Sequence, residues 1–286
     1  MKTQVPPPRK VAHQEYTWSD KRRPRTFGSL YKYRQVLLFT VWKDLRIRYK
    51  QTVLGVAWVI LQPLATMLVF YHVIFGSRRL GFPMKSGSQG VPLYLGLVVW
   101  GFALAVIANG STALLYNHSI ITKVYFPREI PVLSVTLAGL VDLAAALLLF
   151  PPMAILTHTP INWAGFGVGL LLIVPLAIIL HSLAVLLAAL IVVFRDVKIL
   201  VQFLLTGLFF LSAVFIPATF YVARFQSIVL ANPIAIVIDT FRHLSVGTPS
   251  SIGRAQLIPA TIVTAIVIVS SRVAFRLAQR RITDVL

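Results

Sequence analysis

The sequence predicts an all-α integral membrane protein with six transmembrane helices. Of its 286 residues, 57% are hydrophobic and only 12% are charged, and the mean hydropathy is +0.82. Soluble domains usually carry about 25% charged residues and could not bury so much apolar surface. Several apolar stretches reach the roughly 20 residues that a transmembrane helix needs, and they exclude the short alternating strands of a membrane β-barrel.

The basic residues are distributed as membrane topology requires. The formal net charge is +19, and 13 of the 27 Lys and Arg lie before residue 51, with four more close to the C-terminus. This distribution indicates orientation and contact with anionic lipid headgroups, and it argues against nucleic-acid binding. The chain has no cysteine, so disulfides, thiolate metal sites and a cysteine nucleophile are excluded.

The first 52 residues precede the apolar stretches and divide into two parts. Residues 1–28 are polar and basic and are predicted to form a disordered cytosolic tail. Residues 29–52 are predicted to form an amphipathic helix that lies in the membrane interface. One face of this helix carries Leu38, Trp42, Leu45 and Tyr49, and another carries Lys43, Arg46 and Lys50.

Residues 53–286 form the predicted transmembrane domain. Pro63 is expected to kink the first span, and the fourth is long enough for strong tilt. The roughly 40 residues before the last span are too apolar for a solvated loop and too broken for a span, so they predict a re-entrant pair of short helices. The six spans are expected at about residues 53–75, 92–115, 130–156, 163–194, 199–216 and 255–275.

The orientation follows from the positive-inside rule. With six spans, both termini lie on the same side of the membrane. Placing that side in the cytoplasm gives 21 Lys and Arg to the inside segments and 6 to the outside segments. The segment KVYFPREIP at residues 123–131 therefore faces the cytoplasm, and the re-entrant pair faces the opposite side.

The chain carries few groups that could perform catalysis. It has no G-x-x-x-x-G-K-[ST] loop for ATP, no H-E-x-x-H motif and no acidic cluster for a metal. Asp142 is the one carboxylate well inside a span, where it either lines a substrate path or hydrogen-bonds a neighbouring helix. His181 is interpreted as a packing residue, and Gly165 and Gly169 as a G-x-x-x-G packing seam, a weak signal by itself. So few intramembrane ionisable groups argue against a proton-coupled carrier.

Five segments, in a fixed order, resemble one transporter family. They are WKDLRIRYKQTVLGVAWVILQPLATMLVF at 42–70, NHSIITKVYFPREIP at 117–131, FRDV at 194–197, SAVFIPATFY at 212–221 and LANPIAIVIDTFRH at 230–243. They are similar to the membrane subunits, or permeases, of ABC transporters that export bacterial polysaccharides of the O-antigen type, a type-2 ABC permease family. The chain departs from that pattern at Ala213, where proline is usual, at Ile216, where tyrosine is frequent, and at Asp239, where glutamate is frequent.

The resemblance implies a transport subunit that is not itself an enzyme. The expected complex lies in the bacterial inner membrane and contains two copies of this chain and two ABC ATPase subunits, which bind ATP and magnesium. The expected substrate is a polysaccharide linked to undecaprenyl diphosphate, which moves from the cytoplasm to the periplasm during lipopolysaccharide biosynthesis. No cofactor and no metal are expected in this chain.

The resemblance and the residue chemistry together give four groups of candidate site residues. The ATPase-coupling segment, or cytoplasmic gate, is expected at Asn117, Ile121, Lys123, Tyr125, Phe126, Pro127 and Arg128. The lipid diphosphate is expected to meet Arg46, Arg48 and Lys50, for which headgroup snorkelling is the alternative. Channel-lining aromatic residues, if not simply packing, are expected among Trp58, Phe70, Tyr71, Tyr94, Trp100, Phe102, Phe203, Phe209, Phe210 and Phe215. The periplasmic gate is expected to include Pro217, Tyr221, Asn232, Pro233 and Arg242.

Other functions remain open at this point. One is export of capsule polysaccharide, teichoic acid or a drug by the same superfamily. Another is a membrane enzyme acting on a lipid-linked sugar, which predicts activity of the purified chain without ATP. A secondary carrier predicts transport that an uncoupler abolishes, whereas the ABC exporter predicts a neighbouring gene for a P-loop ATPase.

Overall fold

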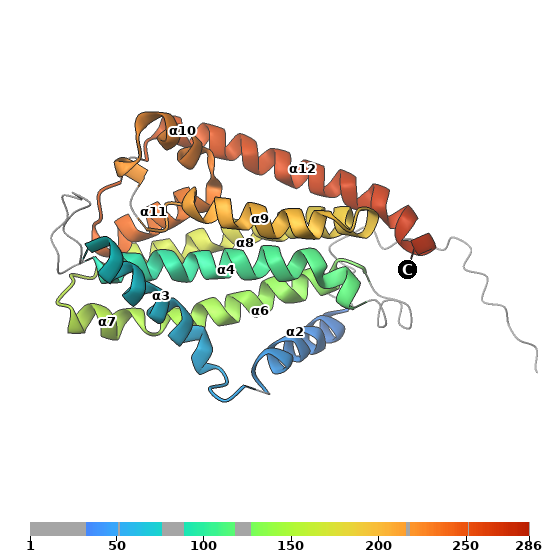
Figure 1. The fold of residues 1–286 in the computed structure, drawn as a ribbon, viewed down its shortest axis with the longest axis horizontal. Helices are drawn as coiled ribbons and strands as arrows, with labels where there is room; N and C mark the ends of the chain where they lie inside the picture. Colours follow the sequence, from blue (N-terminus) through green and yellow to red (C-terminus); the bar gives the residue numbers. More distant parts are fainter. Residues whose placement is uncertain are drawn as a thin grey trace, which may run out of the picture.

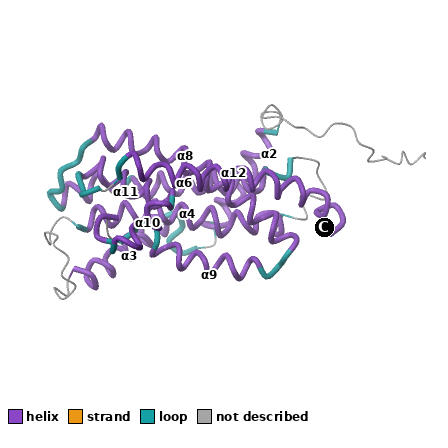
Figure 2. The backbone as a smooth tube through the Cα atoms, turned by 90° about the horizontal axis from the view of Figure 1, so that it is seen from above, coloured by secondary structure: helices purple, strands orange, loops and turns teal. Residues whose placement is uncertain are grey.

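The computed structural model describes residues 33–50, 52–75, 89–117, 127–215, 218–250 and 252–285. All regular secondary structure in these ranges is helical, and the helices form one elongated bundle (Figures 1 and 2). This confirms the all-α prediction. The predicted cytosolic tail at residues 1–28 lies outside the described residues.

The first two helices, α2 (Arg34–Tyr49) and α3 (Ala57–Phe75), are joined by a turn. The predicted first span begins at residue 53, but the helix begins only at Ala57, because Gly55 takes a left-handed conformation with φ of +54°. Figure 1 shows that α3 is steeply inclined to the helices beside it. Pro63 lies inside α3, as the sequence predicts.

Helix α4 (Gly90–Tyr116) forms the centre of the bundle, with buried residues on all its faces. It packs against α6 (Ile130–Leu147) and α8 (Trp163–Val193), which follow it in the chain. A helix that is apolar all round is expected in such a position. The predicted third span consists of two helices, α6 and the short α7 (Phe150–Leu156), because Pro151 and Pro152 cannot continue the backbone hydrogen bonding of α6.

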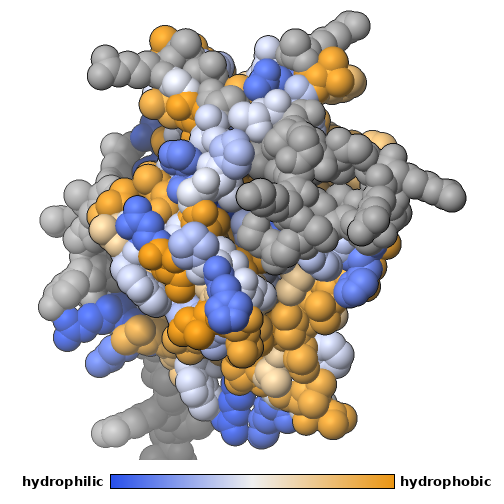
Figure 3. All heavy atoms as spheres, turned by 90° about the vertical axis from the view of Figure 1, so that its left-hand side faces the viewer, coloured by the Kyte–Doolittle hydropathy of each residue, from blue (hydrophilic) through white to orange (hydrophobic). Residues whose placement is uncertain are grey.

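Helix α9 (Val197–Phe210) lies at one edge of the bundle, on the same side as α3 (Figure 2). A short 3₁₀ turn, η1 (Ala218–Phe220), then leads to α10 (Ala223–Ala231) and α11 (Pro233–Val246). These two helices are bent by 89° at Asn232, which matches the predicted pair of short helices. They occupy one end of the bundle, where Figure 3 shows hydrophilic and hydrophobic residues intermingled on the surface.

The last helix, α12 (Arg254–Val285), continues from the predicted sixth span through the basic C-terminal segment without a break. By length and composition, four helical segments of the described chain could cross a membrane, or five if the bent α10–α11 pair counts as one. The predicted spans at α3 and α9 are apolar but shorter than these. Helix α2 begins and α12 ends at the same end of the bundle (Figure 1).

Candidate functional site

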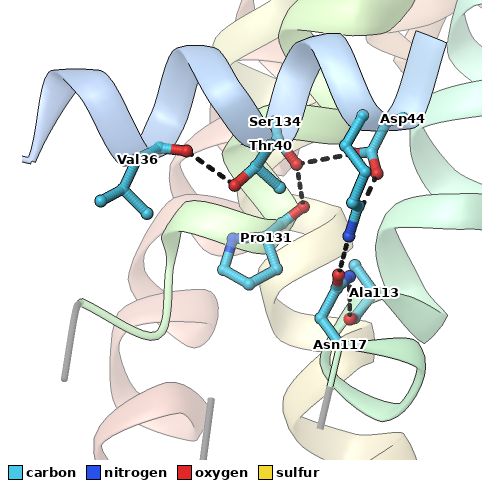
Figure 4. A network of polar contacts seen from close by, with 8 residues as sticks. Val36, Thr40, Asp44, Ala113, Asn117, Pro131 and Ser134 are labelled. Carbon is cyan, nitrogen blue, oxygen red and sulfur yellow. Dashed lines mark hydrogen bonds and ion pairs between the residues drawn. The ribbon is translucent and has the colours of Figure 1, made fainter. Parts of the chain in front are cut away.

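Helix α2 is attached to the bundle through the polar residues of its inner face. Lys43 donates a 2.5 Å hydrogen bond from Nζ to Oδ1 of Asn117, the residue that caps the end of α4. Asn117 is 7% exposed, and its Nδ2 donates to the carbonyl oxygen of Ala113 (Figure 4). Lys43 was predicted to face lipid headgroups, but it instead joins α2 to the end of α4.

The neighbouring residue on α2, Asp44, contacts the first turns of α6. Ser134 Oγ donates a 2.8 Å hydrogen bond to Oδ2 of Asp44 and lies 2.9 Å from the carbonyl oxygen of Pro131 (Figure 4). Lys43 Nζ lies 3.8 Å from Oδ1 of Asp44, so the two side chains also form an ion pair. Neither Asp44 nor Ser134 was predicted as a site residue, because an isolated Asp or Ser gives no sequence signal for its partner.

The third attachment of α2 involves Asp142, whose role the sequence left undecided. Arg48 donates a 2.7 Å hydrogen bond from Nη1 to Oδ2 of Asp142, and the Tyr49 hydroxyl donates a 2.6 Å bond to Oδ1. Asp142 therefore bonds a neighbouring helix, which was one of the two alternatives. We call Lys43, Asp44, Arg48, Tyr49, Asn117, Ser134 and Asp142 the α2 network.

The outer face of α2 carries apolar and basic side chains together, so the predicted separation into an apolar and a basic face is not seen. Leu38 is 64% exposed and Trp42 is 51% exposed on this face. Arg46 lies over the Trp42 ring, with its guanidinium carbon 4.6 Å from the ring centroid, and Lys50 is exposed. Of the three residues predicted to meet the lipid diphosphate, Arg48 already has a protein partner, whereas Arg46 and Lys50 lie on the surface.

The predicted coupling segment is described only at its two ends. Asn117 belongs to the α2 network, and Pro127 and Arg128 are half-buried just before α6. The other predicted residues, Ile121, Lys123, Tyr125 and Phe126, lie outside the described residues.

Five of the predicted channel aromatics form one cluster. Phe70 of α3 lies 4.2 Å from Phe215 and 6.3 Å from Phe209, measured between ring centroids. Trp100 of α4 lies 5.4 Å from Phe209, and Phe210 lies 5.9 Å from Phe215. The cluster joins α3, α4 and the end of α9, and it remains exposed at Phe210.

The other predicted channel aromatics are separate from this cluster. Tyr94 and Phe102 are 0% and 3% exposed, and the Tyr94 hydroxyl donates to the carbonyl oxygen of Ala146. They are core residues of α4, so in this structure they do not line a channel. Trp58 is exposed at the start of α3, Tyr71 is half-buried near its end, and Phe203 is exposed on α9.

At the other end of the bundle, α11 holds the segment that follows α9. Arg242 is 1% exposed and donates from Nη2 to the carbonyl oxygens of Ala213 and Val214, the latter at 2.9 Å. Asp239, also 1% exposed, accepts from the backbone N–H of Ala218 at 3.2 Å and from the Ser250 hydroxyl at 3.0 Å. Both side chains thus fix backbone or hydroxyl groups of neighbouring segments.

Asn232, at the bend between α10 and α11, completes this arrangement. Its Oδ1 accepts from the N–H of Ile234 as the N-cap of α11, and its Nδ2 donates to the carbonyl oxygen of Leu211 and to Ser212 Oγ. We call Asn232, Asp239 and Arg242 the α11 clamp. Two predicted gate residues, the half-buried Asn232 and the buried Arg242, are therefore anchors.

Two of the remaining predicted gate residues, Tyr221 and Pro233, lie beside the clamp. Tyr221 donates a 2.8 Å hydrogen bond to the carbonyl oxygen of Phe210. Burial raises the pKa of the Tyr221 hydroxyl by more than the charge of Arg242 lowers it. Its hydroxyl is therefore protonated at neutral pH. Pro233 begins α11, and Pro217 lies outside the described residues.

Two weaker sequence signals have structural explanations. A side chain at Gly165 would overlap the Leu244 carbonyl, and one at Gly169 would overlap the Phe241 ring, so the two glycines form a packing seam between α8 and α11. His181 Nδ1 lies 3.2 Å from Thr136 Oγ1, as expected for a packing residue with a hydrogen-bond partner.

No group of three or more His, Cys, Asp or Glu that could hold a metal occurs among the described residues. The described chain instead combines apolar membrane-length helices, a short helix attached to them by an ion pair and hydrogen bonds, and an aromatic cluster. These features define the class of multi-pass, all-helical membrane proteins.

Comparison with known proteins specifies the family. The family model described as ABC-2 type transporter matches residues 35–245, and the chain belongs to this family. It is 29% identical over 227 residues to an O-antigen export system permease protein of Myxococcus xanthus, covering 77% of this chain and 84% of that protein. It is 26% identical over 204 residues to a protein of the same name from Klebsiella pneumoniae, covering 71% and 76%. These matches confirm the resemblance drawn from the sequence motifs.

Proposed function

We propose that this chain is the permease subunit of an ATP-driven exporter that moves a lipid-linked polysaccharide of the O-antigen type from the cytoplasm to the periplasm. The observation that carries the proposal is the match, over more than two thirds of both chains, to O-antigen export permeases. The ABC-2 family and the absence of an ATP-binding loop in the sequence support a separate ATPase partner.

The proposed complex contains two copies of this chain and two ATPase subunits in the bacterial inner membrane, with both termini of the chain in the cytoplasm. The start of α2 and the end of α12 lie at one end of the bundle, which is compatible with that orientation (Figure 1). The six membrane crossings are α3, α4, α6 with α7, α8, α9 and α12. The bent α10–α11 pair then lies at the periplasmic end.

The proposed ATPase contact is the segment from Asn117 to Arg128. The α2 network supports this role because Lys43 and Asp44 contact residues on the two sides of the segment, Asn117 before it and Ser134 after it. A load applied to the segment would reach α2, α4 and α6 together. Tyr125 and Phe126 are proposed as its contact side chains.

The proposed path of the glycan runs along the edge formed by α3 and α9. Most side chains on α9 are exposed, including Phe203 at 75% and Phe210 at 58%, and the aromatic cluster lies beside them. Sugar rings stack on such surfaces, and exposed Gln202 and Thr206 of α9 add hydrogen-bonding groups. A second copy of the chain facing this edge would complete a channel.

The proposed contacts of the diphosphate anchor are Arg46 and Lys50. Both lie on the surface of α2, near the end of the helix that leads into α3. Arg48 is omitted from this role because its guanidinium is bonded to Asp142.

The test is reconstitution with the ABC ATPase that the proposal expects a neighbouring gene to encode. Both proteins are co-expressed, purified as a complex and placed in lipid nanodiscs for ATP hydrolysis, while export is followed in cells by surface O-antigen. We expect a stable complex, and we expect Tyr125→Ala with Arg128→Ala to retain ATP hydrolysis and lose export. Gln35→Ala, an exposed change on α2, serves as the control.

Other outcomes would change the assignment. If the complex exports capsule polysaccharide or teichoic acid but no O-antigen, the assigned substrate would change to that polymer. Transformation of a lipid-linked sugar by the purified chain without ATP would replace the transporter by a membrane enzyme. Export that survives ATP depletion and stops with an uncoupler would indicate a carrier.

A further inference from the structure

We propose that Asp142 is a positioning residue that anchors α2 within the bundle, so that α2 and the two flanks of the coupling segment move as one body. The transport consequence of this proposal rests on the proposed function. The anchor itself is a statement about α2 and α6 and can be measured without the ATPase.

The anchor lies far from the end of α6 that carries the coupling segment. Asp142 follows Ile130, the first residue of α6, by twelve positions, which corresponds to roughly 18 Å along the helix. Its carboxylate is 19% exposed and the Arg48 side chain is 24% exposed. Separating two such charges in apolar surroundings leaves both without a partner, so the pair resists opening.

Both carboxylate oxygens of Asp142 are used by α2. Arg48 occupies Oδ2 at 2.7 Å and Tyr49 occupies Oδ1 at 2.6 Å. Two donors from adjacent residues of one helix fix the rotation of that helix as well as its position. A single ion pair would leave α2 free to turn about its axis.

This rotation determines which residues of α2 reach the coupling segment. Asp44 precedes Arg48 by four residues, so the two lie on the same face of the helix, and Lys43 is next to Asp44. With Arg48 and Tyr49 held on Asp142, Asp44 meets Ser134 and Lys43 meets Asn117. The anchor therefore sets both contacts at the flanks of the coupling segment.

Without the anchor, the polar contacts of Lys43 and Asp44 near the end of the bundle would remain, together with the packing of α2 on α6, but Asp142 would no longer fix the rotation of α2. Force applied to the segment at residues 118–126 would then turn or lift α2 instead of moving α4 and α6 with it. We therefore expect loss of Asp142 or Arg48 to uncouple ATP hydrolysis from export, while the complex with the ATPase still forms.

The position of α2 can be measured directly because the chain contains no cysteine. Spin labels are attached at Leu38→Cys on α2 and Leu148→Cys after α6, which are 64% and 74% exposed. Labelled chains are diluted with unlabelled chains, so that only distances within one protomer are recorded. Arg48→Gln and Asp142→Asn are compared with Ile47→Ala and Val141→Ala, exposed neighbours of the same two residues.

The expected result is a broader or shifted distance distribution for Arg48→Gln and Asp142→Asn, and an unchanged distribution for the two controls. Export per ATP hydrolysed should fall about tenfold or more in the same two variants. The reversed pair, Arg48→Asp with Asp142→Arg, should partly restore both the distance distribution and the export per ATP hydrolysed. Such a recovery would not be expected if the loss of either side chain simply disturbed the structure.

An unchanged distance distribution in both Arg48→Gln and Asp142→Asn overturns the proposal. If either variant fails to fold, Tyr49→Phe is used in its place. It removes only the second donor to Asp142, so it should broaden the distance distribution to a smaller extent. If α2 is displaced in the variants but even the wild-type chain binds no ATPase, the anchor stands and the proposed function fails.

Discussion

The two ends of the bundle hold their polar residues in different ways. In the α2 network, side chains of one helix pair with side chains of others, and the ion pair of Arg48 with Asp142 is about one fifth to one quarter exposed. In the α11 clamp, buried side chains bind mainly backbone groups, namely the carbonyls of Ala213 and Val214 and the N–H of Ala218.

This difference shows how narrowly each end of the bundle selects its hydrogen-bond partners. A carboxylate such as Asp142 accepts hydrogen bonds from any suitably placed cation, so the α2 network depends mostly on charge. Backbone carbonyls have fixed positions, and a single nitrogen of Arg242, Nη2, donates to two of them. The α11 clamp therefore depends on the exact place of that nitrogen. A substitution that keeps a cation opposite Asp142 should therefore be tolerated better than one that displaces the donor of Arg242.

Replacing arginine by lysine at both ends should distinguish binding that depends on charge from binding that depends on the position of the donor. Arg242→Lys is expected to destabilise the protein by about 3 kcal/mol, because the shorter lysine side chain would not place its ammonium where Nη2 of Arg242 lies and would leave both buried carbonyl acceptors unpaired. Arg48→Lys is expected to cost under about 1 kcal/mol, because Asp142 still has a cation and the Tyr49 hydroxyl. Thermal unfolding in detergent measures both, with exposed Arg195→Lys as the control. Equal losses at Arg242 and Arg48 would refute the distinction.

A glycine substitution tests the fit at the α11 end more locally. A Cβ at Gly165 would overlap the backbone carbonyl of Leu244, which cannot rotate away as a side chain could, so Gly165→Ala should cost about 1–3 kcal/mol. Gly167, two residues later in α8, has nothing within 4 Å of an added Cβ. Gly167→Ala should be neutral or stabilising by up to about 1 kcal/mol through helix propensity. The pair is compared by unfolding midpoint, and a loss at Gly167 equal to that at Gly165 would contradict the packing explanation.

The backbone at Ala213 gives a third test of the α11 end. Ala213 has φ of +51°, a left-handed conformation, and its carbonyl is one of those held by Arg242. Proline, which is usual at this position in the family that the sequence resembles, fixes φ near −65° and cannot adopt it. Ala213→Pro should therefore destabilise the chain by about 2 kcal/mol, and Ala213→Gly should be neutral or slightly stabilising. An Ala213→Pro variant with unchanged stability would show that this turn has a second acceptable conformation.

The sequence was most informative about long apolar helices. The helices α4, α8 and α12 lie where their apolar stretches predicted them, because hydropathy over about 20 residues depends on composition alone. Breaks were harder to predict. The separation of α7 from α6 at Pro151 and Pro152 and the late start of α3 after Gly55 depend on single residues within otherwise apolar runs.

The candidate site was predictable only in its composition. The sequence singled out Asp142 and Arg48, but the two are 94 residues apart and nothing local indicates that they pair. Lys43 and Tyr49 were assigned to helical faces, yet both face the bundle because their partners Asn117 and Asp142 lie there. Pairing depends on tertiary packing, which helical periodicity does not encode.

The aromatic residues show the same limit. Phe70, Trp100, Phe209 and Phe210 do form one cluster, in which Trp100 is itself buried. Tyr94 and Phe102 are also buried in α4 but lie outside the cluster. Because α4 is apolar on every side, its sequence contains no sign of which face meets a neighbour and which meets a channel. Only the packing of α6 and α8 around α4 decides this.

The smallest expected effect compares the loss of one hydroxyl at each end. Tyr221→Phe removes the donor to the Phe210 carbonyl and should cost about 1 kcal/mol, since that acceptor lies beside the aromatic cluster. Ser134→Ala removes the donor to Asp44 but leaves the ion pair of Asp44 with Lys43, so it should cost less than half as much. Ser270→Ala, whose hydroxyl bonds only within its own helix, is the control for both in thermal unfolding. If Ser134→Ala loses more stability than Tyr221→Phe, the ion pair with Lys43 does not compensate for the missing hydroxyl at Asp44. The α2 network would then tolerate substitution less well than the α11 end.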